Sequence, residues 1–249
     1  MNKFAMKNKR YDLLDTIRGI VLMSMIVYHT SWNLVYMYGV DWDWYRSYGA
    51  YLWQQSICWT FILLSGFCFS LGRKHLKNGL IVFGSGGLVT GVTLIAMPGN
   101  RVVFGVLTCI GSCILLLTFT EKLWKKIPAE EGMAMSFLIF LLTKNINSGY
   151  LGFGALRLVE LPGNWYSNYF TTFIGLPFAG FYSTDYFSLI PWFFLFLAGY
   201  FSWELISNIT PLVNVFHIKV PFLSHIGNKT IWIYLLHQPL LYAIAYLLI

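Results

Sequence analysis

Four polar residues recur along one apolar segment near the start of the chain. The segment RYDLLDTIRGIVLMSMIVYHTSWNLVY, residues 10–36, carries Asp15, Arg18, His29 and Asn33. At about 100° per residue, a helix places all four on one stripe, because Arg18 and His29 are eleven positions apart and the other two lie one turn outside them. A charge facing lipid costs roughly 2.5–3.5 kcal/mol, so the stripe must face the protein interior or a water-filled cavity.

The spacing suits two different tasks at the two ends of this stripe. A step of eleven residues at about 1.5 Å each separates Arg18 from His29 by roughly 16 Å, about the length of a pantetheine arm. Arg18, with Asp15 beside it, suits a phosphate group near the membrane surface. His29 suits a general base at depth, with Asn33 or Ser65 donating a hydrogen bond to an oxyanion. The alternatives are a structural Asp15–Arg18 ion pair and an interior histidine bonded to a carbonyl.

Five further residues are candidates for binding, each with a structural alternative. Arg73 and Lys74, in GRKHLKN at 72–78, suit coenzyme A phosphates or anchor the chain on anionic lipid. Asp41, among tryptophans, suits a carbohydrate acceptor or belongs to an aromatic belt. Asp185 contacts the acceptor or caps the helix that follows it. His237, two residues before a proline, lines the site or is a structural interior histidine.

The elements that must position these residues are membrane helices. Hydrophobic residues make up 57% of the 249 residues and charged residues 11%, and the mean hydropathy is +0.61. Too little polar surface remains to cover a soluble globule of this size. The four cysteines lie in apolar runs without neighbouring acidic or histidine ligands, so neither a metal site nor a disulfide framework is predicted. The net charge of +7 is not gathered into a basic cluster on a soluble domain, which excludes nucleic acid as a partner.

The apolar runs predict an all-α, polytopic bundle of about seven transmembrane helices forming a single domain over residues 1–249. They lie near 17–38, 51–71, 79–97, 102–120, 132–144, 186–207 and 229–248. The segment 165–182 is broken by glycine and proline and is interpreted as re-entrant or interfacial, with a full crossing of the membrane as the alternative. Thirteen of the 17 Lys and Arg fall on one side, which predicts a cytoplasmic basic N-terminus at residues 1–16 and an external C-terminus.

Several motifs resemble those of a known family. The segment LDTIRG with its following His29, together with FILLSGF (61–67), FGVLTCIG (104–111), DYFSLIPWF (185–193) and IGNKTIWIYLLHQP (226–239), resembles the bacterial branch of the heparan-alpha-glucosaminide N-acetyltransferase catalytic-domain family. That family is similar to the acyltransferase-three group, whose hallmark is an Arg, ten residues and a His in the first span. The resemblance implies that Arg18 helps to hold the coenzyme A end and that His29 is the catalytic base.

The predicted function is therefore acyl transfer across a membrane. Acetyl-coenzyme A, or a similar acyl-coenzyme A, is the expected donor, and the acceptor is a hydroxyl or amine of a sugar-like molecule. Direct transfer is the preferred route, with an acyl-histidine as the alternative. The expected location is a bacterial inner membrane, and a homodimer stays open. The competing interpretation is a transporter or flippase, since buried polar residues and a broken apolar segment could also line a substrate path.

Overall fold

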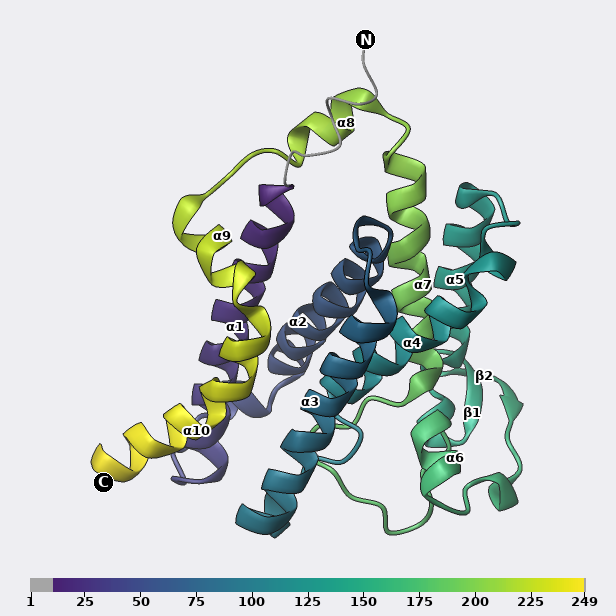
Figure 1. Cartoon of the computed structure of the whole chain (residues 1–249). Coiled ribbons are helices and arrows are strands. Elements are labelled where there is room, and N and C mark those ends of the chain that lie inside the picture. The colour runs from purple at the N-terminus through teal and green to yellow at the C-terminus, as the bar shows by residue number, and fades with distance from the viewer. Residues whose placement is uncertain (1–10, 249) are drawn as a thin grey trace. The chain divides into compact units, whose positions relative to one another are not determined.

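Helices make up most of the chain (Figure 1). The computed structural model describes residues 11–248, so residues 1–10 of the predicted cytoplasmic N-terminus lie outside the described residues. The chain divides into two compact units, residues 1–61 with 206–249 and residues 62–205, and helix α2 runs through both. Each unit is described by itself.

The first unit is built around α1, which carries the polar stripe. Its elements are α1 (Asp12–Tyr36), the short η2 (Asp43–Arg46), the first part of α2 (Tyr48–Phe67), α8 (Thr210–Val215), α9 (Pro221–Asn228) and α10 (Thr230–Leu248). Its apolar core consists of buried residues from α1 and α2: Val21, Leu22, Met25, Ile57 and Phe61. Partly buried residues of α9 and α10 complete this core, so both C-terminal helices are held against the stripe-bearing helix.

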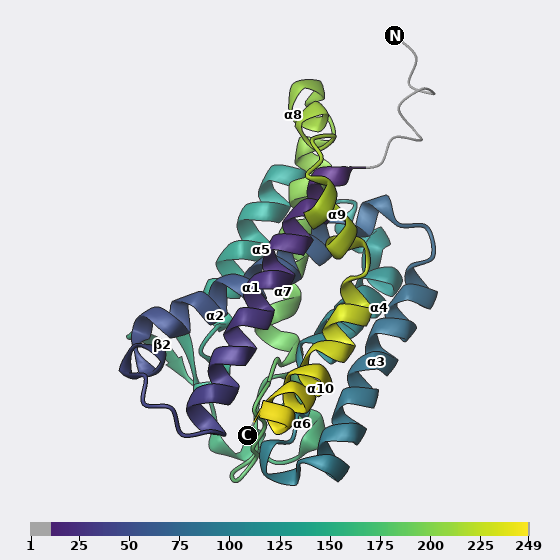
Figure 2. The ribbon, with the colours of Figure 1, turned by 90° about the vertical axis from the view of Figure 1, so that its left-hand side faces the viewer.

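Two glycines let α1 and α9 approach at backbone distance. A methyl group on Gly19 would lie 2.1 Å from the carbonyl oxygen of Leu223, and one on Gly227 would lie 1.8 Å from that of Asp15. Any side chain would separate the helices, because real carbon atoms do not approach oxygen that closely. Figures 1 and 2 show α9 beside the first half of α1. The short α9 therefore lies directly against the helical turns that carry Asp15 and Arg18.

The second unit holds the remaining elements. They are η3 (Phe69–Leu71), α3 (His75–Ala96), η4 (Pro98–Asn100), α4 (Val106–Trp124), α5 (Ala129–Thr143), η5 (Ile146–Ser148), β1 (Tyr150–Phe153), β2 (Leu156–Glu160), η6 (Gly163–Trp165), α6 (Tyr169–Ile174) and α7 (Leu189–Ile206), besides the end of α2. Helix α7 is buried nearly all round, as expected for a helix that is apolar on every face. It packs closely against α2, since a methyl group on Gly199 would lie 2.1 Å from the Leu63 carbonyl oxygen.

The small antiparallel hairpin of β1 and β2 is a departure from the predicted all-α fold. A two-residue connection joins the strands, and its first residue, Gly154, has φ +57°. Glycine adopts this left-handed conformation without the penalty that a side chain would bring, which suits a tight hairpin turn. The hairpin does not change the helical class of the chain.

All seven apolar runs contain a helix, but they differ in length. Among the described residues, five helices are long and apolar enough to cross a membrane: α1, α2 with η3, α3, α4 and α7. The run at 132–144 forms α5, which has 15 residues, and the last run forms α10, whose described apolar part is shorter than the five. The segment 165–182 forms only the six-residue α6 and irregular chain. A membrane protein of several helices is thus confirmed, and a count of seven spans stays a prediction.

Candidate active site

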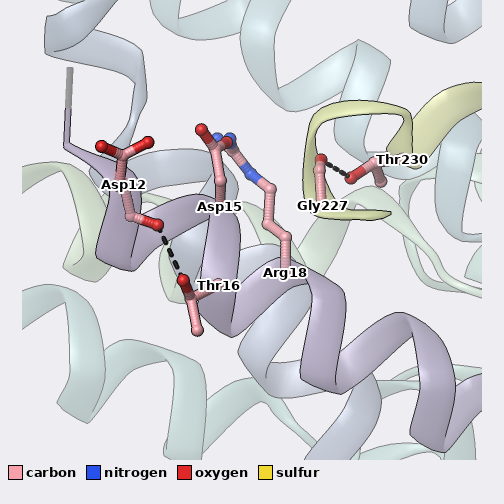
Figure 3. Close-up of polar contacts among 6 residues, drawn as sticks. All are labelled: Asp12, Asp15, Thr16, Arg18, Gly227 and Thr230. Carbon is pink, nitrogen blue, oxygen red and sulfur yellow. Dashed lines mark hydrogen bonds and ion pairs between the residues drawn. The ribbon is translucent and has the colours of Figure 1, made fainter. Parts of the chain in front are cut away.

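The cytoplasmic end predicted for the polar stripe carries an ion pair. Arg18 Nη1 lies 2.8 Å from Asp15 Oδ1, one turn away on α1. The Asp15 side chain is 7% exposed, whereas that of Arg18 is 28% exposed. Figure 3 shows the guanidinium turned back toward the carboxylate, together with the α9–α10 turn, where Thr230 Oγ1 donates to the Gly227 carbonyl. A guanidinium has five N–H donors, so this pair leaves Arg18 able to bind an anion as well.

The other end of the stripe carries a hydrogen-bonded network between α1 and α10. Gln238 Nε2 lies 2.9 Å from Nδ1 of His29. Asn33 Nδ2 donates to Gln238 Oε1 over 3.3 Å. One glutamine amide therefore joins the two residues that the sequence assigned to catalysis. The structure brings His29 and Asn33 together through a residue that is more than 200 positions away in the chain.

His237 completes the cluster from α10. Its ring centroid lies 4.9 Å from that of His29, and its side chain is buried. Its Nδ1 lies 2.6 Å from the Tyr234 carbonyl oxygen, so Nδ1 carries the proton and Nε2 is left as an acceptor. Pro239 lies inside α10 and has no N–H to bond the Leu235 carbonyl, which weakens the regular helical bonding next to the Tyr234 carbonyl that His237 contacts. The structure thus places His237, a predicted site residue, directly beside His29.

Several buried polar atoms of this unit have no hydrogen-bond partner among the described residues. They are Asn33 Oδ1 on α1, Ser224 Oγ on α9 and His237 Nε2 on α10. A buried polar group without a partner costs about 1–3 kcal/mol, and such groups gather where a ligand or water supplies the missing bond. Two of these three atoms belong to the histidine and amide cluster, which is the arrangement expected of a site that binds a polar substrate.

The remaining predicted site residues have other surroundings. Asp41 is exposed and lies 3.5 Å from Arg46 Nη1, in a surface ion pair. Ser65, Arg73 and Lys74 belong to the second unit, where Arg73 and Lys74 are exposed in the turn that precedes α3. The structure thus groups Asp15 with Arg18, and His29 with Asn33 and His237. The functional roles of all the predicted site residues stay predictions.

Asp185 caps a different helix from the one that the sequence suggested. Its Oδ2 accepts a hydrogen bond of 3.1 Å from the backbone N–H of Val106, the first residue of α4, whereas α7 begins only at Leu189. Burial raises the pKa of Asp185 to about 6, and the bond from Val106 opposes that rise. The prediction that Asp185 caps the following helix was wrong, because the loop folds the carboxylate back onto an earlier helix.

Gln238 is the main residue that the sequence did not identify. The sequence feature that could have indicated Gln238 is its position next to His237 in YLLHQP. A local pattern cannot show, however, that the Gln238 amide reaches His29 on α1. Ser224 was also missed, because α9 lies between the last two predicted spans, where no helix was predicted. Among the described residues, no group of three or more His, Cys, Asp and Glu side chains could hold a metal ion.

Comparison with known proteins identifies the family. The family model for heparan-alpha-glucosaminide N-acetyltransferase, catalytic, matches residues 10–239, which confirms the resemblance. No curated protein and no solved structure matches the chain. The matched region contains the whole polar stripe, α9 and the histidine of α10. The chain therefore belongs to the heparan-alpha-glucosaminide N-acetyltransferase catalytic family and is a membrane transferase of that family.

Proposed function

We propose that this protein transfers an acetyl or similar acyl group from cytosolic acyl-coenzyme A to a hydroxyl or amine of a sugar-like acceptor. The observation that carries the proposal is the cluster of His29 and Asn33 on α1 with His237 and Gln238 on α10, in which Asn33 and His237 are buried and the other two are half-buried. His29 and Asn33 share one face of α1 with the Asp15–Arg18 pair. A transport path would not need a histidine ring held by one amide that a second amide bonds in turn, whereas a general base must be held in one orientation.

The donor binds, in this proposal, along the stripe of α1. Arg18 contacts a phosphate of coenzyme A, since a guanidinium stays charged and forms bidentate bonds to phosphate. Asp15 orients the guanidinium and is itself held by the backbone contact with Gly227. The rise of about 1.5 Å per residue separates Arg18 from His29 by roughly 16 Å, so a pantetheine arm anchored at one end brings its thioester to the other.

His29 acts as the general base. Its unprotonated ring nitrogen takes the proton of the acceptor O–H or N–H while the acceptor atom attacks the thioester carbonyl carbon. Asn33 donates a hydrogen bond to the oxyanion that develops on that carbonyl oxygen. The carbon–sulfur bond then breaks, the thiolate of coenzyme A takes the proton from the imidazolium, and the acylated acceptor leaves. Acyl-coenzyme A and acceptor are thus converted into coenzyme A and acyl-acceptor, with His29 restored.

The orientation in the membrane is part of the same proposal. The excess of Lys and Arg on one side favours a cytoplasmic N-terminus, which places Arg18 on the side where acyl-coenzyme A is made. We assign the protein to a bacterial inner membrane and treat the whole chain as one catalytic domain. Reporter fusions in the loops after α2 and after α3 test the orientation, since the first should report cytoplasm and the second the opposite side.

Binding of acetyl-coenzyme A to the purified, detergent-solubilised protein tests the proposal. A ligand selective for the folded protein stabilises it by about 2.7 kcal/mol at a concentration of 100 Kd, so the melting temperature should rise. Arg18→Ala should reduce this shift strongly. Arg46→Ala is the matched control. Arg46 lies in the same unit, and among residues 11–248 its one ion pair is exposed, so this substitution should leave the shift intact.

Two outcomes separate the competing functions. If folded protein shows no shift with saturating acetyl-, succinyl- or longer acyl-coenzyme A, the acyltransferase proposal fails and a transporter becomes the better interpretation. If His29→Ala binds acetyl-coenzyme A as wild type does but releases no coenzyme A in the presence of acceptors, the roles of donor site and base are both supported.

A further inference from the structure

The geometry points to Gln238 as a positioning residue that, together with Asn33, selects the catalytic tautomer of His29. This inference rests on the proposed acyl transfer and deepens it. Its basis is the pair of contacts at 2.9 and 3.3 Å that link the His29 ring, the Gln238 amide and the Asn33 amide in one chain. The three groups have two consistent sets of hydrogen bonds, and only one of them makes His29 a base.

In the first arrangement, Asn33 Nδ2 donates to Gln238 Oε1, and Gln238 Nε2 donates to His29 Nδ1. A neutral imidazole that accepts at Nδ1 carries its proton at Nε2. The free nitrogen of the ring is then a donor and cannot take a proton from an acceptor molecule. The carbonyl oxygen of Asn33 is buried without a partner among the described residues.

The second arrangement follows when both amides turn by 180° about their last carbon–carbon bonds. Nitrogen and oxygen exchange places, and the same positions of the heavy atoms are kept. His29 Nδ1 now donates to Gln238 Oε1, and Gln238 Nε2 donates to the carbonyl oxygen of Asn33. The Nε2 atom of His29 becomes an acceptor, while the N–H₂ group of Asn33 takes the buried position that had no partner. One concerted reversal thus creates both a base and an oxyanion donor.

Only the second arrangement tolerates the protonated state that the reaction requires. An imidazolium carries protons on both ring nitrogens, so in the first arrangement its Nδ1–H would meet the N–H of Gln238. In the second arrangement the Gln238 carbonyl oxygen accepts that proton and stabilises the positive ring. A buried charge without such an acceptor is strongly unfavourable, so the reaction proceeds through the arrangement that Gln238 and Asn33 set together.

The pH profile reports the protonation of His29 only if the neighbouring groups that also titrate are known. His237 faces it from α10, Tyr28 lies beside it on α1 with ring centroids 5.8 Å apart, and Tyr45 from η2 donates to the Tyr28 carbonyl. His225 on α9 is an exposed side chain and is not one of these neighbours. Burial raises the pKa of Tyr45 above its ordinary value of 10, so Tyr45 does not titrate in the range where histidine does. Among these neighbours, the two histidines of the cluster are the groups whose protonation a substitution of Gln238 should change.

Substitution of Gln238 tests the inference through kcat and the pH profile. Gln238→Leu removes both bonds and should lower kcat on the order of 100-fold, with the KM for acetyl-coenzyme A changed less than about twofold. Gln238→Glu has the same shape but places a carboxylate beside the ring, which favours the imidazolium, so the low-pH loss of activity should move to higher pH. Gln54→Leu is the control, since Gln54 bonds only Gln55 among the described residues and should leave both readouts unchanged.

A double substitution shows whether the two amides act as one unit. Asn33→Leu also removes the oxyanion donor, so it should cost at least as much as Gln238→Leu. The double variant should lose little more than Asn33→Leu alone, because either change breaks the same chain. Additive losses, or a Gln238→Leu variant with wild-type kcat and pH profile, would overturn the inference.

A spectroscopic readout separates this inference from the proposed function. Nitrogen-15 NMR of labelled His29 in lipid nanodiscs distinguishes a protonated Nδ1 from a protonated Nε2. With acetyl-coenzyme A bound, wild type should show protonated Nδ1, and Gln238→Leu should lose that preference while keeping its melting temperature. A protonated Nε2 in wild type under these conditions contradicts the role of Gln238 even if acyl transfer is found. Failure to transfer an acyl group to any acceptor refutes the proposed function while the tautomer remains measurable.

Discussion

A single methyl group on Gly227 should disrupt the contact that seats Asp15 and Arg18. In Gly227→Ala, the new carbon would lie 1.8 Å from the Asp15 carbonyl oxygen, 2.7 Å from its carbonyl carbon and 3.1 Å from its Cα. All three atoms are backbone atoms of α1, so no side chain can move aside to accommodate the methyl group. Either α9 moves away from α1 or the first turns of α1 shift.

The size of the effect follows from two opposing contributions. Overpacking costs about 1–3 kcal/mol, and contact with backbone on a rigid helix places this case near the upper value. Alanine in place of glycine inside a helix returns about 1 kcal/mol. The net loss in the free energy of unfolding is therefore about 2 kcal/mol. At about 2–4 °C per kcal/mol for a chain of this size, the melting temperature should fall by roughly 4–8 °C.

The assay compares Gly227→Ala with Gly84→Ala in detergent by thermal unfolding and by acetyl-coenzyme A binding. Gly84 lies within α3 with no atom within 4 Å of a new methyl group, so its substitution should leave stability unchanged or raise it. Gly227→Ala should also weaken acetyl-coenzyme A binding, because Arg18 moves with α1. A Gly227→Ala protein with wild-type melting temperature and wild-type affinity would refute the argument that backbone contact between α1 and α9 positions the donor site.

Three further substitutions test single contacts. Asp185→Asn should remove a pH dependence of unfolding. The raised pKa of about 6 means that the carboxyl group destabilises the folded state as pH rises from about 4 through 6, by on the order of 3 kcal/mol. In thermal unfolding, the variant should therefore be more stable than wild type at pH 7 but not at pH 4. Thr16→Val should cost about 1 kcal/mol in chemical denaturation, because its hydroxyl accepts a bond from the Val220 N–H at the start of α9; an unchanged midpoint would contradict this. Pro239→Ala should raise the melting temperature, because alanine restores a helical hydrogen bond. It should also lower kcat on the order of 10–100-fold, because His237 moves. A kcat equal to that of wild type would show that the helix geometry at this position does not matter for the reaction.

The polar stripe of α1 could be predicted because it depends on helical periodicity alone. The Asp15–Arg18 pair follows from their spacing of one turn, and the need to bury polar groups away from lipid follows from composition. The lengths of the apolar runs likewise predicted where helices form. These features depend on neighbours within a few turns, and sequence patterns report such neighbours well.

The features that the sequence did not reveal depend on contacts between distant segments. Gln238 bonds His29 from a different helix, and no local pattern indicates which face of α10 meets α1. The α9 helix is short, and the two glycine contacts that hold it join its backbone to that of α1, which is far away in the sequence. Asp185 precedes α7 in the chain, and only the path of the loop shows that it caps α4. Length alone also left the spanning role of α5 and α10 undecided.

The most direct test of the central claim is a single-turnover measurement with radiolabelled acetyl-coenzyme A. Purified wild-type protein, His29→Gln and the control His225→Ala, whose side chain is exposed on α9, are mixed with donor and a panel of amino sugars and sugar hydroxyl acceptors. Wild type and His225→Ala should form labelled acceptor and free coenzyme A in equal amounts, while His29→Gln binds the donor and forms neither. Transfer by His29→Gln at the wild-type rate would contradict the assignment of His29 as the base.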